Sequence, residues 1–217
     1  MQQFFGVYPA VVRNNIDPTQ SGRVQVQLST PLDPTVKNLP FWARVAALSA
    51  GSQRGTWFMP EVKDEVLVAF AGGDPRQPYV LGALWGSGGQ PPETVDPANT
   101  IKSIHTRSGV RITISDQAGQ EQISIHTPAG QSITLRDGPG AISIIDGNGN
   151  AITLQTSGIQ VTSSSTVKMN VSQIEVNAGM LTVNSGMSKF SGVVQCDTLI
   201  ASSVVGSSYT PGAGNLV

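Results

Sequence analysis

The feature that most constrains this 217-residue chain is a repeat of paired aliphatic residues in its second half. Each pair encloses one small polar residue, and glycine, asparagine, aspartate or proline marks the turns between most pairs. The period is about nine to eleven residues, as in a β-helix or β-solenoid. The pairs are Ile112/Ile114, Ile123/Ile125, Ile133/Leu135, Ile142/Ile144 and Ile152/Leu154.

The same repeat continues beyond Gly158 at a shorter period of about seven or eight residues. Its later members are Ile159/Val161, Val167/Met169/Val171, Ile174/Val176 and Leu181/Val183. A single-chain β-helix needs rungs of about 20 residues to close, so each of these units supplies only one face. Three chains that share each level would close the prism, which predicts an obligate homotrimer. With about 4.8 Å between strands, roughly ten or eleven strands would form a needle about 50 Å long.

The first half differs from the second in composition and pattern, because it contains most of the aromatic residues and five short β-rich runs. These runs cover residues 7–12, 23–28, 42–46, 65–70 and 79–84. Residues 23–28 alternate polar and apolar side chains, as a half-buried strand does. Proline and glycine separate the runs, and no helical pattern intervenes. The sequence therefore predicts an all-β protein whose first half is a five-stranded OB-fold barrel.

Composition divides the chain further. Residues 86–92 are rich in glycine and proline, a strong linker signal. We expect a barrel over 1–88, a linker over 89–100, a trimeric β-helix needle over 101–200 and a tip or tail over 201–217.

Charge and cysteine content argue against several classes of protein. The net charge is −1 and no block of lysine or arginine occurs, which argues against general nucleic-acid binding and against a polybasic membrane anchor. The single cysteine, Cys196, rules out an intrachain disulfide and a cysteine-rich metal site. No apolar run approaches the roughly 18 residues that span a bilayer. The first residues lack a signal-peptide pattern, so we expect synthesis in the cytoplasm.

The first half resembles the N-terminal OB domain of the baseplate assembly protein V family of contractile phages. It resembles equally the matching domain of type VI secretion spike (valine-glycine repeat G) proteins. The residues that carry the resemblance are 6–12 (GVYPAVV), 17–18 (DP), 22–26 (GRVQV), 42–45 (WARV), 50–51 (AG), 58–62 (FMPEV), 64–70 (DEVLVAF), 73–75 (GDP), Pro78 and 81–82 (LG). The repeat half and the segment 209–215 (YTPGAGN) also look like members of this spike group.

The resemblance implies a trimeric spike at the centre of a baseplate in a phage tail or a phage-tail-like particle. The OB domain would sit beneath a trimeric hub protein, with Trp42 in the barrel core or, with Arg44, at the hub interface. A PAAR-like tip protein would cap the needle, and sheath contraction would drive it through the target cell envelope. We expect Tyr209 and Leu216 to anchor the tip protein, since an aromatic residue is rare in this aliphatic half.

The chain departs from the family pattern at several points. Lys63 stands where the family usually has glycine, which would be costly if the turn needs a positive φ. The hub domain that some members carry is absent, which predicts a separate hub protein and favours a phage or phage-like particle. No lysozyme domain separates barrel from needle. Residues 207–217 contain no histidine, so no apical iron is expected, and no cofactor or other metal is predicted.

Several bolder interpretations compete with simpler ones. The simpler prediction for the acidic cluster Glu61, Asp64 and Glu65 is a polar turn. The alternative is a pair of carboxylates for acid/base catalysis. His105 and His126 face solvent, unless three copies of one of them ring a metal or an anion. The glycines of residues 147–150 serve tight turns rather than a calcium repeat.

The main functional prediction is a structural spike without enzymatic activity. One alternative is a β-helix enzyme that degrades polysaccharide. The other is a nucleic-acid-binding OB protein, in which Trp42 would stack on bases and Arg44 would clamp a phosphate.

Overall fold

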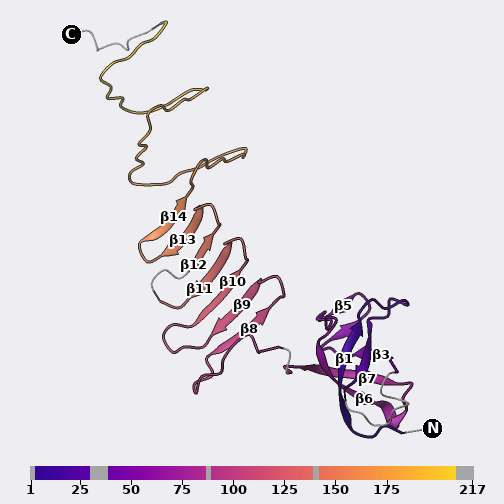
Figure 1. Ribbon diagram of the computed structural model, residues 1–217. Helices are drawn as coiled ribbons and strands as arrows, with labels where there is room; N and C mark the ends of the chain where they lie inside the picture. Colours follow the sequence, from indigo (N-terminus) through magenta and orange to yellow (C-terminus); the bar gives the residue numbers. More distant parts are fainter. Residues whose placement is uncertain (1–2, 30–38, 87–88, 139–141, 209–217) are drawn as a thin grey trace. The chain divides into compact units, whose positions relative to one another are not determined.

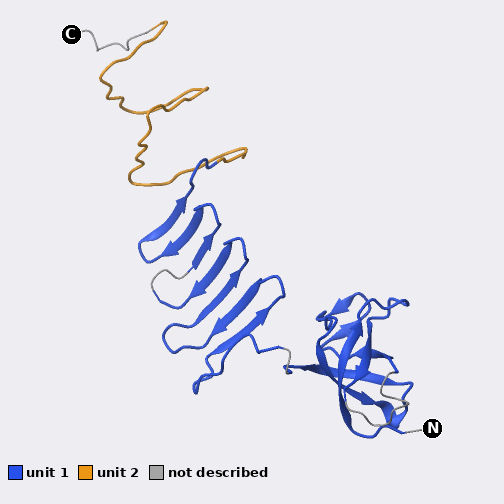
Figure 2. Ribbon diagram, in the orientation of Figure 1, with its two compact units in different colours: residues 1–167 blue, residues 168–217 orange. Residues whose placement is uncertain are grey.

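The computed structural model describes residues 3–29, 39–86, 89–138 and 142–208, which form strands, turns and one 3₁₀ turn at Ala71–Gly73. The chain divides into two units, residues 1–167 and 168–217, which Figure 2 colours separately. Among the described residues, no helix has the length and apolarity to cross a membrane.

The first half folds into a closed five-stranded barrel, as predicted. Its strands are β1 (Val7–Asn14), β2 (Arg23–Leu28), β3 (Phe41–Val45), β6 (Glu65–Phe70) and β7 (Pro78–Leu84). They close in the order β1-β2-β3-β7-β6, and β3 and β7 form the only parallel pair in this barrel. A short hairpin of β4 (Ala50–Gly51) and β5 (Arg54–Gly55) lies outside the barrel order (Figure 1).

Alternate residues of the barrel strands point inward and make the core. Burial follows period two along β2 and β6, so that Val24, Val26, Val66 and Val68 are fully buried. Each buried valine contributes about 1.5 to 3 kcal/mol relative to an exposed one. An aromatic cluster of Phe4, Tyr8, Phe41 and Phe70 joins this core, and the rings of Phe4 and Phe70 lie 4.8 Å apart.

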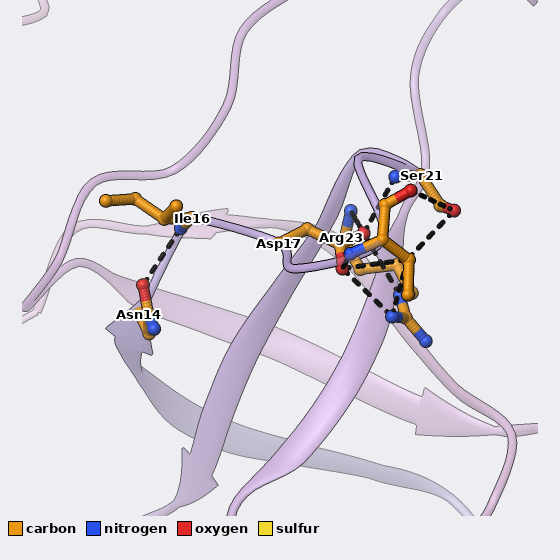
Figure 3. A network of polar contacts seen from close by, with 6 residues as sticks. Asn14, Ile16, Asp17, Ser21 and Arg23 are labelled. Atoms are coloured by element: carbon orange, nitrogen blue, oxygen red, sulfur yellow. Dashed lines mark hydrogen bonds and ion pairs between the residues drawn. The ribbon is translucent and has the colours of Figure 1, made fainter.

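A carboxylate organises the loop between β1 and β2 (Figure 3). Asp17, with its side chain 4% exposed, accepts hydrogen bonds from the backbone nitrogens of Thr19, Ser21 and Arg23. It also pairs with the Arg23 guanidinium, at 3.1 Å from Nε and 2.9 Å from Nη2. The Arg23 guanidinium, assisted by the Thr19 and Ser21 donors and opposed by burial, holds the pKa of Asp17 well below its usual range. The motif residues Asp17 and Arg23 thus fix the entry of the chain into β2.

The turn before β6 needs a left-handed residue. The Asp64 nitrogen donates to the Glu61 carbonyl at 3.0 Å, and Lys63, between them, has φ of 83°. The Lys63 nitrogen and the Asp64 carbonyl bond to the backbone of Val12 at 2.9 Å each. This turn therefore requires the positive φ for which glycine is the usual residue.

The repeat begins as a seven-stranded antiparallel meander, in which each strand pairs with the next (Figure 1). The strands are β8 (Ile101–His105), β9 (Arg111–Ser115), β10 (Gln122–His126), β11 (Ser132–Arg136), β12 (Ile142–Ile145), β13 (Ala151–Gln155) and β14 (Gly158–Thr162). Each predicted aliphatic pair from Ile112 to Val161 falls within one of these strands.

Turns with the same hydrogen-bond pattern recur at one end of the strands of this sheet, at residues 106–110, 127–131 and 146–150. In each turn, the backbone nitrogen of the first residue donates a hydrogen bond to the carbonyl oxygen of the fifth residue, at 2.9 to 3.0 Å. The fourth residue is a glycine with positive φ. In the third turn, Asp146 accepts from Asn150 and Asn148, and the Asn150 side chain in particular lowers the pKa of Asp146. These contacts are those of a tight turn, as the sequence predicts for residues 147–150.

Strand structure stops at Thr162 in the single chain. Residues 163–208 contain no strand, and their aliphatic side chains are exposed, as at Val171 (62%) and Val183 (66%). Within its described residues, the repeat of the single chain thus forms seven of the roughly ten or eleven expected strands. A strand needs a paired edge and a covered apolar face, and nothing described within the chain supplies either to this segment.

Candidate trimerisation and docking surfaces

The register of the meander aligns the aliphatic pairs into two rows on one face. One row is unbroken from β8 to β14: Ile104, Ile112, Ile125, Ile133, Ile144, Ile152 and Val161. The second row runs Ile114, Ile123, Leu135, Ile142, Leu154 and Ile159, with Lys102 in its first position. Residues two apart along a strand share a face, so both rows lie on the same side of the sheet.

This apolar face is uncovered in the single chain. Ile112 is 37% exposed and Ile123 45% exposed, and most of the other members fall between these values. A monomeric protein rarely exposes an apolar patch of more than a few hundred Å². The face is therefore a surface that another chain must cover.

The opposite face is mostly polar, although Ile101 and Ile145 also lie on it. Its central row, again aligned by the register, is Ser103, Thr113, Ser124, Thr134, Ser143 and Thr153. These side chains are small, uncharged and at least half-buried, and Ser124 is only 3% exposed. The two faces thus differ sharply in chemistry, although they belong to the same strands.

His105 and His126 lie on the polar face, where they flank Arg111 in the register. The His105 Nε2 is 3.1 Å from the Glu93 carboxylate. The side chains of His126 and Ile125 point to opposite faces of the sheet, as the alternation along a strand predicts.

An apolar groove of about 660 Å³ marks the end of the ordered sheet. Ile133, Ile144, Ile152 and Val161 line it together with Val167, the first aliphatic residue beyond the strands. The groove continues the apolar face toward the strandless segment and has room for side chains of another chain.

The barrel places Trp42 and Arg44 together on the outer face of β3. Ala43 between them is fully buried, so both point outward and Trp42 is not a core residue. Arg23 lies 5.6 Å from the Trp42 ring, and Arg44 lies 5.7 Å from the Tyr79 ring. The result is an outer surface of alternating guanidinium groups and aromatic rings, which we call the cation–aromatic face (Arg23, Trp42, Arg44, Tyr79).

A second group of aromatic side chains adjoins Arg44. Leu48, Trp57 and Phe58 are 97%, 74% and 70% exposed, and they border a pocket of about 870 Å³ that Arg44 also lines. The Trp57 ring covers Gly22, where an added Cβ would be 3.5 Å away. Phe58 belongs to the motif 58–62 that carries the resemblance, but no binding role was predicted for it or for Leu48 and Trp57, although an adjacent tryptophan and phenylalanine outside any β-rich run was a visible signal.

The acidic cluster before β6 is a structural turn. Asp64 Oδ2 accepts the backbone nitrogen of Glu61 at 2.8 Å, which uses the carboxylate to close the turn. Among the described residues, no group of three or more histidine, cysteine, aspartate or glutamate side chains could hold a metal ion. Tyr209 and Leu216, the expected tip-protein anchors, lie outside the described residues.

A closed barrel is followed in this chain by a sheet with an uncovered apolar face, and each of these two parts matches a known protein family. Residues 8–85 match the sequence model of the type VI secretion system/phage-baseplate injector OB domain. Residues 122–182 match that of the phage baseplate V C-terminal trimerisation domain. The chain belongs to the phage baseplate V spike family, and the trimerisation domain supports a homotrimer.

Curated relatives include spike proteins of type VI secretion systems. The chain is 36% identical over 114 residues to the spike protein VgrG5 of Pseudomonas aeruginosa, a match covering 49% of this chain and 14% of that protein. It is 37% identical over 87 residues to the spike protein VgrG3 of Vibrio cholerae, covering 38% and 9% respectively. It is 38% identical over 88 residues to the actin cross-linking toxin VgrG1 of Vibrio cholerae, covering 38% and 8%. The chain thus spans less than a fifth of the length of these relatives.

Proposed function

We propose that this chain is the membrane-piercing central spike in the baseplate of a contractile phage tail or a phage-tail-like injection system. The observation that carries the proposal is the pair of aliphatic rows on one face of a β-meander, in a chain of the baseplate V family. A face of this kind suits three identical chains around one axis, because each chain then covers the apolar rows of its neighbours.

The needle would bury the apolar rows at the threefold axis and turn the Ser/Thr row outward. Each isoleucine that loses its remaining exposure on assembly contributes about 1 to 2 kcal/mol. Residues 163–208 would gain their strand pairing from the other two chains, which accounts for their lack of strands in one chain alone. A closed prism has no free lateral edge, and a neutral hydroxyl surface forms no strong ion pairs with what it passes.

The barrel would seat the spike on a trimeric hub protein through the cation–aromatic face. Tryptophan, tyrosine and arginine are the residues most enriched among interface hot spots. Trp42 and Arg44 are central in this set, and the exposed Trp57 and Phe58 extend the surface beside Arg44. Replacing Trp42 with alanine should weaken hub binding at least tenfold, and the exposed Gln3→Ala change should not.

The far end of the needle would carry a PAAR-like tip protein through Tyr209 and Leu216. This part of the proposal rests on the sequence, in which Tyr209 is a rare aromatic residue. Deleting residues 207–217 should abolish capture of the tip protein by the purified spike. Unchanged capture would contradict the assignment.

The proposed role is mechanical and needs no catalytic group or cofactor. The particle would be assembled from components made in the cytoplasm, and the needle would act at the target cell envelope. Within the described meander, the acidic residues Asp116, Glu121, Asp137 and Asp146 lie in turns, between strands rather than paired in a groove.

The first experiment is the mass of the purified chain in solution, by light scattering after size exclusion. We expect three times the chain mass of 22.7 kDa, an elongated profile and resistance to detergent. A compact monomer would contradict the needle and would reopen the enzymatic and nucleic-acid-binding alternatives.

A further inference from the structure

The barrel carries a pocket beside the cation–aromatic face, and the proposed function uses only part of its rim. This is the pocket of about 870 Å³ that is bordered by Arg44, Leu48, Trp57 and Phe58, together with Arg54 of the β4–β5 hairpin. Its volume lies within the range of about 300 to 1,000 Å³ that is usual for ligand sites. We call it the Trp57 pocket.

One wall of the Trp57 pocket is the loop before β2. Ser21 and Gly22 of this loop line the pocket, and the backbone nitrogen of Ser21 donates to the Asp17 carboxylate at 2.9 Å. The Trp57 ring lies against Gly22, with its nearest ring carbon 3.5 Å from where a Cβ would stand. Asp17 is itself held by Arg23, so the network that fixes the entry of the chain into β2 also fixes this wall.

A second wall is the β4–β5 hairpin. The Thr56 nitrogen donates to the Ser49 carbonyl at 2.9 Å, and a Cβ at Gly55 would collide with the same oxygen. Gly55 also has φ of 139°, so this close approach requires glycine. Met59 lines the pocket as well and packs against the buried core of the barrel. The pocket is thus shaped by the fold itself, and a preformed site spares a ligand part of the ordering cost of binding.

The charge of the Trp57 pocket is positive. Arg44 and Arg54 line it, and no acidic residue is among the described residues that do so. Within the described part of the chain, neither guanidinium has a carboxylate within ion-pair distance. A guanidinium matches a carboxylate in charge and in its two-pronged hydrogen-bond geometry. The pocket therefore favours a ligand that carries a carboxylate.

The rim of the pocket is apolar. Leu48, Trp57 and Phe58 are mostly exposed, and their side chains adjoin the two guanidinium groups. Exposed apolar groups that gather at one place mark a site of interaction. Leu48, which is 97% exposed, has no aromatic face on which a base or a sugar could stack. This residue favours an aliphatic or aromatic side chain of a protein over a nucleic acid or a saccharide.

We infer that the Trp57 pocket binds an extended segment of a partner protein, in which a carboxylate stands next to a large apolar side chain. The carboxylate would pair with Arg44 or Arg54, and the apolar side chain would cover Leu48 and Phe58. The inference rests on the proposed function in one respect, since it takes the surface around Arg44 as one that binds a partner. It goes further because a short linear segment should bind the pocket without a folded hub.

Fluorescence anisotropy of a labelled synthetic peptide tests the inference on the full-length chain. The probe is a short peptide in which aspartates flank a leucine and a phenylalanine. One control peptide has serines in place of the leucine and phenylalanine, and keeps the charge. The other has asparagines in place of the aspartates, and keeps the apolar side chains. We expect each control peptide to bind about tenfold more weakly than the probe, or worse.

Two protein variants locate the bound peptide. Leu48→Ser removes an apolar side chain that is 97% exposed, so it should not disturb folding, and Arg54→Gln removes one guanidinium. Each should weaken binding of the probe about tenfold. The matched controls are Val95→Ser, at an aliphatic side chain that is 78% exposed, and Lys63→Gln, at an exposed cation of the barrel. Neither residue lines the pocket, and both variants should bind the probe as the unchanged protein does.

The outcomes separate the pocket from the hub seat. Equal binding of the serine control peptide would show a general attraction of anions and would overturn the inference. Unchanged binding to both Leu48→Ser and Arg54→Gln would place the peptide elsewhere and would also overturn it. Absence of peptide binding, with hub binding still weakened by Trp42→Ala, would overturn the inference and leave the hub seat intact. Peptide binding at the pocket, with hub binding unaffected by Trp42→Ala, would support the inference and contradict the proposed seat.

Discussion

At the residue scale, Lys63 is a side chain in a backbone conformation suited to glycine. Its φ of 83° costs a residue with a Cβ about 1 kcal/mol. We therefore expect Lys63→Gly to raise the free energy of unfolding of the barrel by about 1 kcal/mol, less the small entropic penalty of glycine in the unfolded chain. Calorimetry of the intact protein would measure the change.

The matched control for this variant is Lys63→Ala. It removes the same charge but keeps the Cβ, so it should leave the melting temperature of the barrel nearly unchanged. Equal stabilisation by alanine and glycine would show that the lysine charge, rather than the backbone, carries the cost.

Asp17 gives the barrel a pH-dependent contribution. Its pKa in the folded state is lowered by Arg23, whereas an aspartate in the unfolded chain titrates near about 3.9. A lowered pKa means that the carboxylate stabilises the fold above about pH 4, and that this contribution is lost as the pH falls below that value toward the folded pKa. Asp17→Asn should therefore lower the melting temperature of the barrel by several degrees at pH 7.

The gap between the wild-type protein and Asp17→Asn should narrow below pH 4 in the same melting experiment. Asp74→Asn is a useful comparison, because Arg76 lowers the pKa of Asp74 to about 2, yet the Arg76 side chain is 74% exposed. Solvent weakens such an exposed pair, so this variant should have the smaller effect. A gap for Asp17→Asn that is constant from pH 7 to pH 3 would contradict the role of its charge.

Sequence reasoning located individual barrel residues unevenly. The five β-rich runs were predictable because the alternation of polar and apolar residues is a local signal, and the special position of Lys63 was predictable only from the resemblance, since the family usually has glycine there. The ion pair of Arg23 with Asp17 was not predicted from the sequence. Such pairing depends on how loops fold back over strands, which a period-two pattern does not encode.

At the scale of the elements, neighbouring residues of β11 lie on opposite faces of the meander and should respond differently to an introduced charge. Ile133 is 40% exposed in one chain, and Thr134 on the other face is more buried. A monomeric sheet would therefore tolerate an aspartate better at Ile133, whereas a trimer closed on the apolar rows would tolerate it better at Thr134. Burying three carboxylates at an axis costs on the order of several kcal/mol per ion.

We accordingly expect Ile133→Asp to abolish the trimer, or to lower its dissociation temperature strongly. Thr134→Asp should retain the trimeric mass. The masses of the two variants, measured by light scattering, show which face lies at the axis. A trimer for Ile133→Asp together with no trimer for Thr134→Asp would place the Ser/Thr row there.

Close contact between two turns makes Gly147 a second sensitive point of the sheet. A Cβ at this position would lie 2.4 Å from the Ala129 carbonyl oxygen, in the neighbouring turn of the same edge. We expect Gly147→Ala to destabilise the needle by about 1 to 3 kcal/mol through this clash. Gly89→Ala, at a glycine with nothing within 4 Å, should be neutral in the same thermal denaturation.

The repeat was predictable to the extent that its strands find partners within one chain. The aliphatic pairs from Ile112 to Val161 all form strands, because successive turns bring each strand beside the last. The pairs from Val167 onward have the same pattern but no strand in the single chain. Their pattern predicts which residues face inward, but a pattern does not show which strands they pair with, and in the proposed trimer these would belong to the other copies.

At the scale of the whole molecule, the barrel and the repeat differ in how they bury their apolar residues. The barrel has its own buried core of eleven apolar residues, from Phe4 to Val80. Among the described residues of the repeat, no apolar side chain belongs to a buried core, and the aliphatic rows are mostly exposed in the single chain. Barrel unfolding should therefore be unimolecular, and needle unfolding should be linked to dissociation.

This difference predicts two transitions in calorimetry of the intact spike. The lower one, from the barrel, should not shift when the protein concentration is raised tenfold, because the tethered barrels stay on an assembled needle. The upper one, from the needle, should move to higher temperature with concentration, as mass action requires. The variants assign the peaks: Lys63→Gly should raise only the lower transition, and Gly147→Ala should lower only the upper one. A single transition that responds to both variants would mean that barrel and repeat unfold as one cooperative unit, and the division of the chain near residues 89–100 would then be wrong.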